Sequence, residues 1–196
     1  DGMVKILSGV PAGSFVRSSS FPGSPVAARK ALSRAAAEGT LLFIRPGLYY
    51  RGAMTRYGMA TPSIQEVVTA VLGREGVGPA GFSAARAGGV TTQVPATFHV
   101  ATLKPVAAIA GVTQVSRRNL ARMRLNQKEI ALLELLRAPE VYVEGGWASL
   151  VAAVSDAQRA GLVSWENLLE VGATESNVKV KLGLQLMSEG LNTLAA

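Results

Sequence analysis

A short helix between residues 26 and 38 constrains the fold of this chain most, because the sequence marks both of its ends. Ser24 is placed to cap the N-terminus, Pro25 suits the first helical position, and Gly39 suits the residue after the end. At about 100° per residue the helix has two different faces. One carries Ala28, Ala31, Leu32 and Ala35, and the other carries Val26, Arg29, Lys30, Ser33 and Arg34. We therefore expect one face to pack and the opposite face to be basic.

The segments on both sides of this helix predict a winged helix-turn-helix. Before it lie an apolar segment at 4–7, a strand-like segment at 15–17 and three serines at 18–20 that suit a second short helix. After it, the runs 41–44 and 48–51 flank an Arg45-Pro46-Gly47 turn and predict a β-hairpin. The order helix, strand, helix, basic helix, hairpin is that of a winged helix-turn-helix, which we expect over residues 1–57.

The rest of the chain predicts a second, largely helical domain over residues 62–196. Residues 52–61 are expected to form a connector, and a helix restarts at Thr61-Pro62. The Gly-, Ala- and Thr-rich middle contains strand-like pieces at 97–102 and 106–109. Further helices are expected over 127–137, with a capping box of Asn126 and Glu129, and over 146–159, 164–170 and 174–188. The last of these carries Val178, Leu182 and Leu186 on one stripe, for which we favour a place in the core over a groove for a partner. The predicted fold class is α+β and mainly helical, with a mixed C-terminal domain.

The net charge of +7 is unevenly distributed along the chain. Residues 1–57 hold eight Lys or Arg against two acids, a net of plus six, whereas residues 138–196 hold three against seven, a net of minus four. This asymmetry suggests a polyanion as partner at the N-terminal end and a different partner at the other. No apolar run of about eighteen residues and no signal-peptide pattern occurs, so we expect a soluble cytoplasmic protein without membrane contact.

The basic face of the 26–38 helix has the chemistry that duplex DNA requires. Cations neutralise phosphates, and polar side chains reach base edges in the major groove. Arg29 and Arg34 are the candidates for base contact, since arginine bonds a guanine edge through two N–H groups, while Lys30 and Ser24 suit phosphate. The full set of candidate DNA-binding residues is Ser24, Arg29, Lys30, Ser33, Arg34, Arg45 and Arg51. A solvated basic face is the alternative, but the capped helix with its hairpin favours DNA.

A second basic run between residues 117 and 124 is less specific. Its side chains are candidates for contact with nucleic acid or with an acidic protein partner, and solvation by water alone is the alternative. The residues concerned are Arg117, Arg118, Arg122 and Arg124.

Catalytic chemistry has little support in the sequence. The chain has no cysteine and a single histidine, His99, which lies between Phe98 and Val100 without a nearby carboxylate, so a structural role is favoured. The sequence contains no P-loop spacing, no Gly-x-Ser-x-Gly elbow and no acids at metal-ligand spacing. We expect neither an enzyme nor a bound metal or cofactor.

Several blocks of the sequence resemble the AbiEi-like antitoxins of type IV toxin–antitoxin systems. They are 28–34, 38–41 and 45–49 in the N-terminal part, the stretch 88–95 with its Thr-Thr-Gln-Val-Pro segment, and 124–140. The resemblance covers nearly the whole chain. Two positions depart from the family pattern: Val90 stands where members often have Leu-x-Thr-Thr, and Pro46 replaces a basic residue or glycine in the wing.

The resemblance implies an antitoxin that acts at two places. Its N-terminal domain would bind inverted repeats in its own promoter and repress the operon, and its C-terminal domain would neutralise a nucleotidyltransferase-like toxin, as in abortive infection. DNA contact would fall to Arg29, Lys30, Ser33, Arg34 and Arg45, with no catalytic residue inherited. The alternative is a stand-alone winged-helix transcription regulator whose second domain senses a ligand or dimerises. A neighbouring toxin gene distinguishes the two, and the sequence leaves the oligomeric state open.

Overall fold

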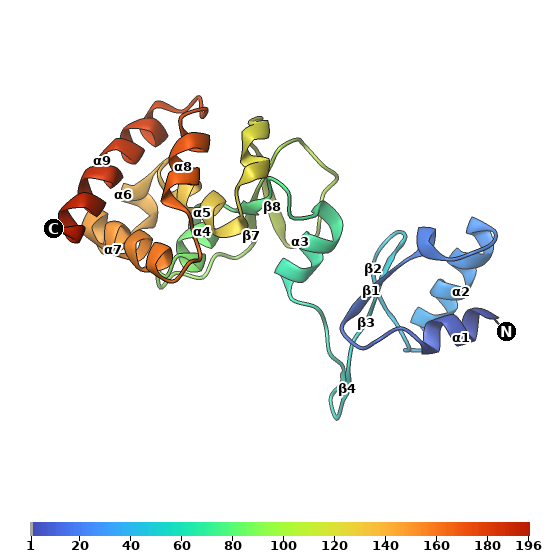
Figure 1. Cartoon of the computed structure of the whole chain (residues 1–196). Coiled ribbons are helices and arrows are strands. Elements are labelled where there is room, and N and C mark those ends of the chain that lie inside the picture. Colours follow the sequence, from blue (N-terminus) through green and yellow to red (C-terminus); the bar gives the residue numbers. More distant parts are fainter. Residues whose placement is uncertain (1) are drawn as a thin grey trace. The chain divides into compact units, whose positions relative to one another are not determined.

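The computed structural model describes residues 2–196, which form two compact units, one ending at Ala70 and one beginning at Val71 (Figure 1). The architecture is mixed α/β, and the described residues contain nine α-helices and eight short β-strands. The division between the units lies in helix α3 (Ile64–Leu72), whereas the sequence predicted a connector at 52–61. A Ser63–Glu66 pair caps the start of α3, since each backbone N–H donates to the other side chain.

The first unit is built on a three-stranded antiparallel sheet. Its elements in chain order are α1 (Gly2–Ser8), β1 (Ser14–Arg17), the 3₁₀ turn η1 (Ser18–Ser20), α2 (Pro25–Ala37), β2 (Leu42–Arg45) and β3 (Leu48–Arg51). Strand β3 lies between β1 and β2 and runs antiparallel to both. The hairpin predicted around the Arg45-Pro46-Gly47 turn is confirmed as β2 and β3.

Helix α2 confirms the strongest sequence prediction. The Ser24 hydroxyl accepts the Ala27 backbone N–H at 3.4 Å, Pro25 opens the helix, and Gly39 after its end has a φ of +80° that favours glycine. Its apolar face is buried against the sheet in one cluster: Leu32 and Ala35 of α2 with Val16, Leu41 and Tyr49. Leu32 is fully buried, which contributes about 1.5–3 kcal/mol to folding of this unit.

A second, smaller hairpin follows β3 where the sequence predicted a connector, so that prediction is wrong. Strands β4 (Met54–Thr55) and β5 (Gly58–Met59) pair antiparallel, and the Thr55 hydroxyl donates to the Gly58 carbonyl at 2.8 Å across the tip. The two ends of this hairpin lie close together, because Gly52 approaches Ala60: a Cβ at position 52 would lie 1.9 Å from the Ala60 carbonyl oxygen. Only glycine fits at that position.

The second unit combines a small mixed sheet with a helical bundle. Its sheet has the order β6 (Gly78–Pro79), β7 (Phe98–Thr102), β8 (Val112–Ser116), with β7 antiparallel to β6 and parallel to β8. The strand expected at 97–102 is confirmed as β7, whereas the one expected at 106–109 is wrong, because β8 begins at Val112. The other elements are α4 (Gly81–Ala87), the 3₁₀ helix η2 (Leu120–Arg124), α5 (Gln127–Leu135), α6 (Pro139–Tyr142), α7 (Gly146–Arg159), α8 (Trp165–Gly172) and α9 (Val178–Ala195).

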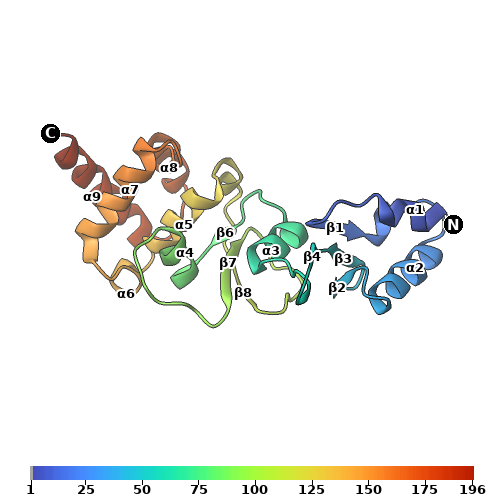
Figure 2. The ribbon, with the colours of Figure 1, turned by 90° about the horizontal axis from the view of Figure 1, so that it is seen from below.

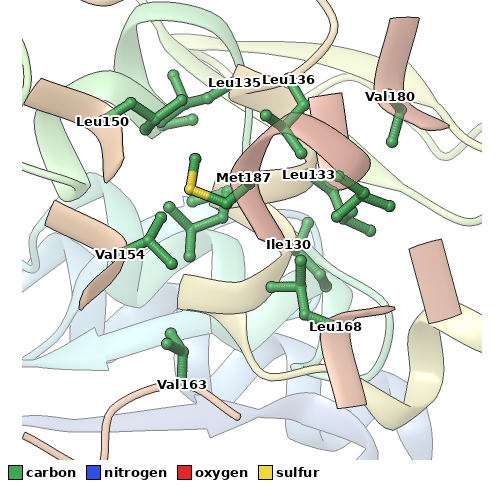
Figure 3. Close-up of a cluster of buried hydrophobic side chains, with 14 of the residues drawn as sticks. Ile130, Leu133, Leu135, Leu136, Leu150, Val154, Val163, Leu168, Val180 and Met187 are labelled. Atoms are coloured by element: carbon green, nitrogen blue, oxygen red, sulfur yellow. The ribbon is translucent and has the colours of Figure 1, made fainter. Parts of the chain in front are cut away.

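Helix α5 is the centre of this unit. Its predicted capping box is confirmed: the Glu129 N–H donates to Asn126 Oδ1 at 2.8 Å, and the Asn126 N–H donates to Glu129 Oε1 at 2.9 Å. Every residue from Glu129 to Leu135 is buried. Side chains of α7, α8 and α9 close around Ile130 and Leu133 (Figure 3). Figure 2 shows α7, α8 and α9 side by side.

Helix α9 differs from its prediction in which face it buries. The sequence assigned the stripe Val178, Leu182 and Leu186 to the core, but these side chains are 67%, 54% and 52% exposed. The face on the other side of the helix, with Val180, Leu184 and Met187, is the buried one. The assignment of the stripe to the core is therefore wrong.

Candidate nucleic-acid interface

The basic face of α2 is open to solvent. Arg29, Lys30, Ser33 and Arg34 are all exposed, on the side of the helix opposite the buried Ala28 and Leu32. Val26 lies one turn before Arg29 and Lys30 and is 58% exposed. The sequence placed Val26 on this face without assigning it a role, although an exposed apolar side chain beside cations suits contact with a thymine methyl group.

The cations on this face have no carboxylate partners. Within residues 2–196, none of Arg29, Lys30 and Arg34 forms an ion pair, and all six ion pairs of the described chain lie in the second unit. Glu38 follows the helix but does not bond to any of the three. The positive charge of α2 is therefore uncompensated and faces water, which is what attraction of a polyanion requires.

The start of α2 adds a second feature suited to phosphate. Ser24 and Pro25 are exposed, and the first backbone N–H groups of a helix carry partial positive charge without intrahelical partners. The Ser24 hydroxyl oxygen already accepts from Ala27. Its own hydrogen is therefore available as a donor to an anion near the helix start.

Two other predicted DNA-binding residues, Arg51 and Arg45, are less accessible than the basic face of α2. Arg51 Nη1 donates to the carbonyls of Leu7 at 2.7 Å, Ser8 at 3.2 Å and Val10 at 2.6 Å, and so fastens the end of α1 to the sheet. These carbonyls occupy Nη1 and give Arg51 a structural role, which leaves its assignment to DNA contact a prediction for the remaining N–H groups. Arg45 at the hairpin is half-buried, and its Nη1 is buried without a hydrogen-bond partner.

The second basic run is mostly an internal ion network. Arg122 is fully buried and donates to Glu134 Oε2 at 2.9 Å and to Glu175. Arg117 donates to both oxygens of Glu134, at 3.0 and 3.2 Å to Oε1 and 3.1 Å to Oε2. The expectation that Arg122 contacts a partner is wrong, because no atom of it reaches the surface, and Arg117 is largely committed to Glu134.

Two groups of this network, Arg122 and Glu175, have pKa values shifted toward their charged forms. Burial lowers the pKa of Arg122, but the hydrogen bond with Glu175 and the charge of Glu134 outweigh it and leave the pKa above its ordinary value. Burial raises the pKa of Glu175, but the bonds from Arg122 and Asn119 outweigh it and hold the pKa below its ordinary value. The ion pairs of Arg122 with Glu134 and Glu175 therefore join η2, α5 and the segment before α9.

The remaining candidates of that run lie on the surface. Arg124 is bonded to Glu170 at 2.6 Å, with both side chains 56% exposed. Arg118 is exposed and forms no ion pair within residues 2–196. A pair as exposed as Arg124–Glu170 contributes about 1 kcal/mol or less, so it opens easily to another partner. Arg118 and Arg124 are thus the two members of the run still free to meet another molecule.

The Thr-Thr-Gln-Val-Pro stretch is fastened to the helical part of the second unit. Glu144 Oε1 accepts from the Thr91 hydroxyl at 3.0 Å and from the Thr92 backbone N–H and hydroxyl, both at 2.8 Å. The Thr92 backbone bond and then the threonine hydroxyls hold the pKa of Glu144 below its ordinary value. Val94, two residues after the bonded Thr92, is 72% exposed in this loop.

His99 has a structural setting in β7. Its backbone N–H donates to the Ser83 hydroxyl at 2.9 Å, and its carbonyl accepts from Ala80 at 3.0 Å. Across residues 2–196, no group of three His, Cys, Asp or Glu side chains is placed to hold a metal ion. The same part of the chain contains no helix whose length and apolar character would let it cross a bilayer.

Comparison with known proteins gives a fold relationship. No model of a protein family matches the chain, and no curated protein matches it. Among solved structures, the RV2827C protein from Mycobacterium tuberculosis matches over 99% of this chain and 79% of its own, with a TM-score of 0.51 and 16% sequence identity. The two proteins therefore share a fold.

Proposed function

We propose that this protein is a DNA-binding regulator and not an enzyme, and that its first unit is a winged helix-turn-helix. Helix α2 is the recognition helix, and β2 and β3 form a short wing. The order of elements and the antiparallel sheet with α2 packed beside it support this assignment. The second helix of the motif is reduced to the 3₁₀ turn η1.

The observation that carries the proposal is the unpaired basic face of α2. In the second unit, five cations are paired with acids: Arg117, Arg122, Arg124, Arg159 and Lys179. The first unit instead leaves three cations of α2 free, on a helix whose opposite face is fixed to a sheet. Such an arrangement presents a rigid positive surface to a groove.

The side chains of the basic face of α2 have separate roles in this proposal. Arg29 and Arg34 read guanine edges through two N–H groups each, and Lys30 neutralises a phosphate. Val26 contacts a thymine methyl, and Ser24 with the helix start binds a phosphate. Ser33 is one turn after Arg29 and contacts a base edge or phosphate. Arg45 contributes only if its half-buried guanidinium turns outward.

We further propose that the protein is a type IV antitoxin acting in the cytoplasm, with promoter inverted repeats and a nucleotidyltransferase-like toxin as its two partners. The resemblance of 28–34, 88–95 and 124–140 to AbiEi-like antitoxins supports this role. The exposed Arg118 and Arg124 and the fixed loop with Val94 are the candidate toxin contacts of the second unit. A stand-alone regulator is the second candidate, favoured by the half-open cavity of about 470 Å³ lined in part by Lys128, Leu132 and Asp156.

The DNA role is tested by selection of sites from genomic fragments with the full chain. Enrichment of one sequence class near the gene's own promoter supports the proposal, and recovery of no fragment above a protein-free control contradicts it. The antitoxin role is tested separately by co-expression with a neighbouring nucleotidyltransferase gene. Rescue of growth by the full chain supports it, and failure of rescue with intact DNA binding moves the function to the stand-alone regulator.

A further inference from the structure

An apolar stripe on α9 lies on the outer surface of the second unit. Val178, Leu182 and Leu186 recur every fourth residue, so they share one face of the helix. More than half of each side chain is exposed, while Val180, Leu184 and Met187 hold the opposite face in the core. The stripe is thus not needed to attach α9 to its own unit.

An exposed residue of α6 lies near the start of this stripe. Lys179 at the start of α9 donates to Glu140 at 2.7 Å, which brings α6 beside the stripe, and Val141 next to Glu140 is 57% exposed. We call Val141, Val178, Leu182 and Leu186 the α9 patch. Contiguous apolar patches of a few hundred Å² on soluble proteins commonly mark an interaction site.

The charges around the α9 patch fit a second copy of the same helix. Lys179 and Lys181 lie at the N-terminal end of the stripe, and Glu189 lies beyond its C-terminal end. An antiparallel register that sets Leu182 against Leu186 of the second copy also sets Lys179 against Glu189 of that copy. Lys179 already bonds Glu140 of its own copy through an exposed pair, so in the dimer its ammonium group is shared between the two acids. Each pairing then occurs twice, as two-fold symmetry requires. A parallel pair would instead stack the lysines of one copy on those of the other.

We propose that α9 pairs antiparallel with α9 of a second copy through the α9 patch, forming a two-fold dimer of this protein. Apolar side chains close the centre of the interface, and the lysine–glutamate pairs flank it and fix the direction. Only four apolar side chains per copy form the patch, so we expect the dimer to form and dissociate with protein concentration. This inference stands apart from DNA binding, because every residue it uses lies in the second unit.

Sedimentation velocity of the full chain across a concentration series tests the association. The expected result is a shift from a 20.4 kDa monomer toward twice that mass as concentration rises. Leu182→Glu should abolish the shift by placing two buried carboxylates against leucines. The matched control is Leu162→Glu, since Leu162 is 49% exposed and lies in the connection between α7 and α8, outside the α9 patch, and this variant should associate like the wild type. A monomer at every concentration, or an equal effect of both variants, overturns the proposal.

The register is tested by disulfide trapping, for which the chain is suited because it has no cysteine of its own. Leu182→Cys and Leu186→Cys proteins, one with a larger tag, are mixed and oxidised. The expected product is the mixed covalent dimer, several-fold in excess over either self-linked dimer, because only the mixed pair faces directly across the interface. Equal amounts of the three dimers contradict the antiparallel register, and self-linked dimers alone overturn it.

Discussion

Removal of Arg122 is expected to destabilise the second unit more than any loss of a surface charge. The Arg122 side chain is 0% exposed, and the carboxylates it bonds are almost as buried, at 1% for Glu134 and 5% for Glu175. Arg122→Met keeps most of the apolar volume but leaves these acids without their shared cation. An uncompensated buried charge is among the costliest changes in a protein interior.

The size of the stability loss follows from the hydrogen bonds that Glu134 and Glu175 keep without Arg122. Glu134 retains Arg117 through both oxygens, whereas Glu175 retains only the bond from Asn119. Most of the loss therefore comes from Glu175, and we place it at the lower end of the range for a broken buried pair, about 3 kcal/mol. With a urea dependence of about 2 kcal/mol per M, the unfolding midpoint should fall by about 1.5 M.

Tryptophan fluorescence provides the assay. The two tryptophans of the chain, Trp147 and Trp165, are both in the second unit, so urea unfolding followed by their emission reports on that unit alone. Arg122→Met combined with Glu175→Gln should recover most of the lost stability, because the second change removes the stranded charge. A midpoint unchanged by Arg122→Met, or a double variant no more stable than the single one, would refute the account of this network.

Three further perturbations have defined outcomes. Burial raises the pKa of Glu175, but the bonds from Arg122 outweigh burial and lower the folded-state pKa, so the stabilisation by Glu175 is present above its unfolded pKa near 4.5 and is lost as pH falls through the folded value. Glu175→Gln should therefore make the free energy of unfolding fall less steeply as the pH is lowered. An unchanged slope counts against this. Gly52→Ala forces a Cβ against the Ala60 carbonyl and should lower the stability of the first unit by about 1–3 kcal/mol. The expected signal is faster hydrogen exchange in the β1–β3 sheet, and unchanged exchange argues against a tight base of the β4–β5 hairpin. Glu144→Gln should speed amide exchange of the 91–93 loop at least several-fold, whereas equal rates would show that the loop is held by other contacts.

Local signals in the sequence were sufficient for the elements that carry their own boundaries. Helix α2 follows from Ser24, Pro25 and Gly39, and α5 follows from the Asn126–Glu129 box. These residues satisfy backbone groups within one turn, so no distant part of the chain is needed to interpret them. The basic face of α2 followed in the same way, from the spacing of its arginines and from the capped start of the helix.

Features that depend on distant partners were not predictable. The parallel pairing of β7 with β8 joins segments separated by a loop, and no periodicity in either strand specifies it. The burial of Arg122 depends on acids 12 and 53 residues away, which a count of local charge does not reveal. Helix α9 is apolar on two faces, and periodicity alone does not say which face is covered, so Val178 and Leu182 were assigned to the core.

The central claim is that the unpaired face of α2 binds DNA, and the affinity of matched variants for a selected site tests it most directly. Fluorescence anisotropy should show that Arg29→Ala and Arg34→Ala each weaken specific binding by about 1–3 kcal/mol, and that Lys30→Ala weakens all sequences alike and lowers the salt slope by about one unit. The charge-matched control Arg159→Ala, at a 76% exposed side chain of α7, should bind like the wild type. Equal affinities for all four variants and the wild type would contradict the claim.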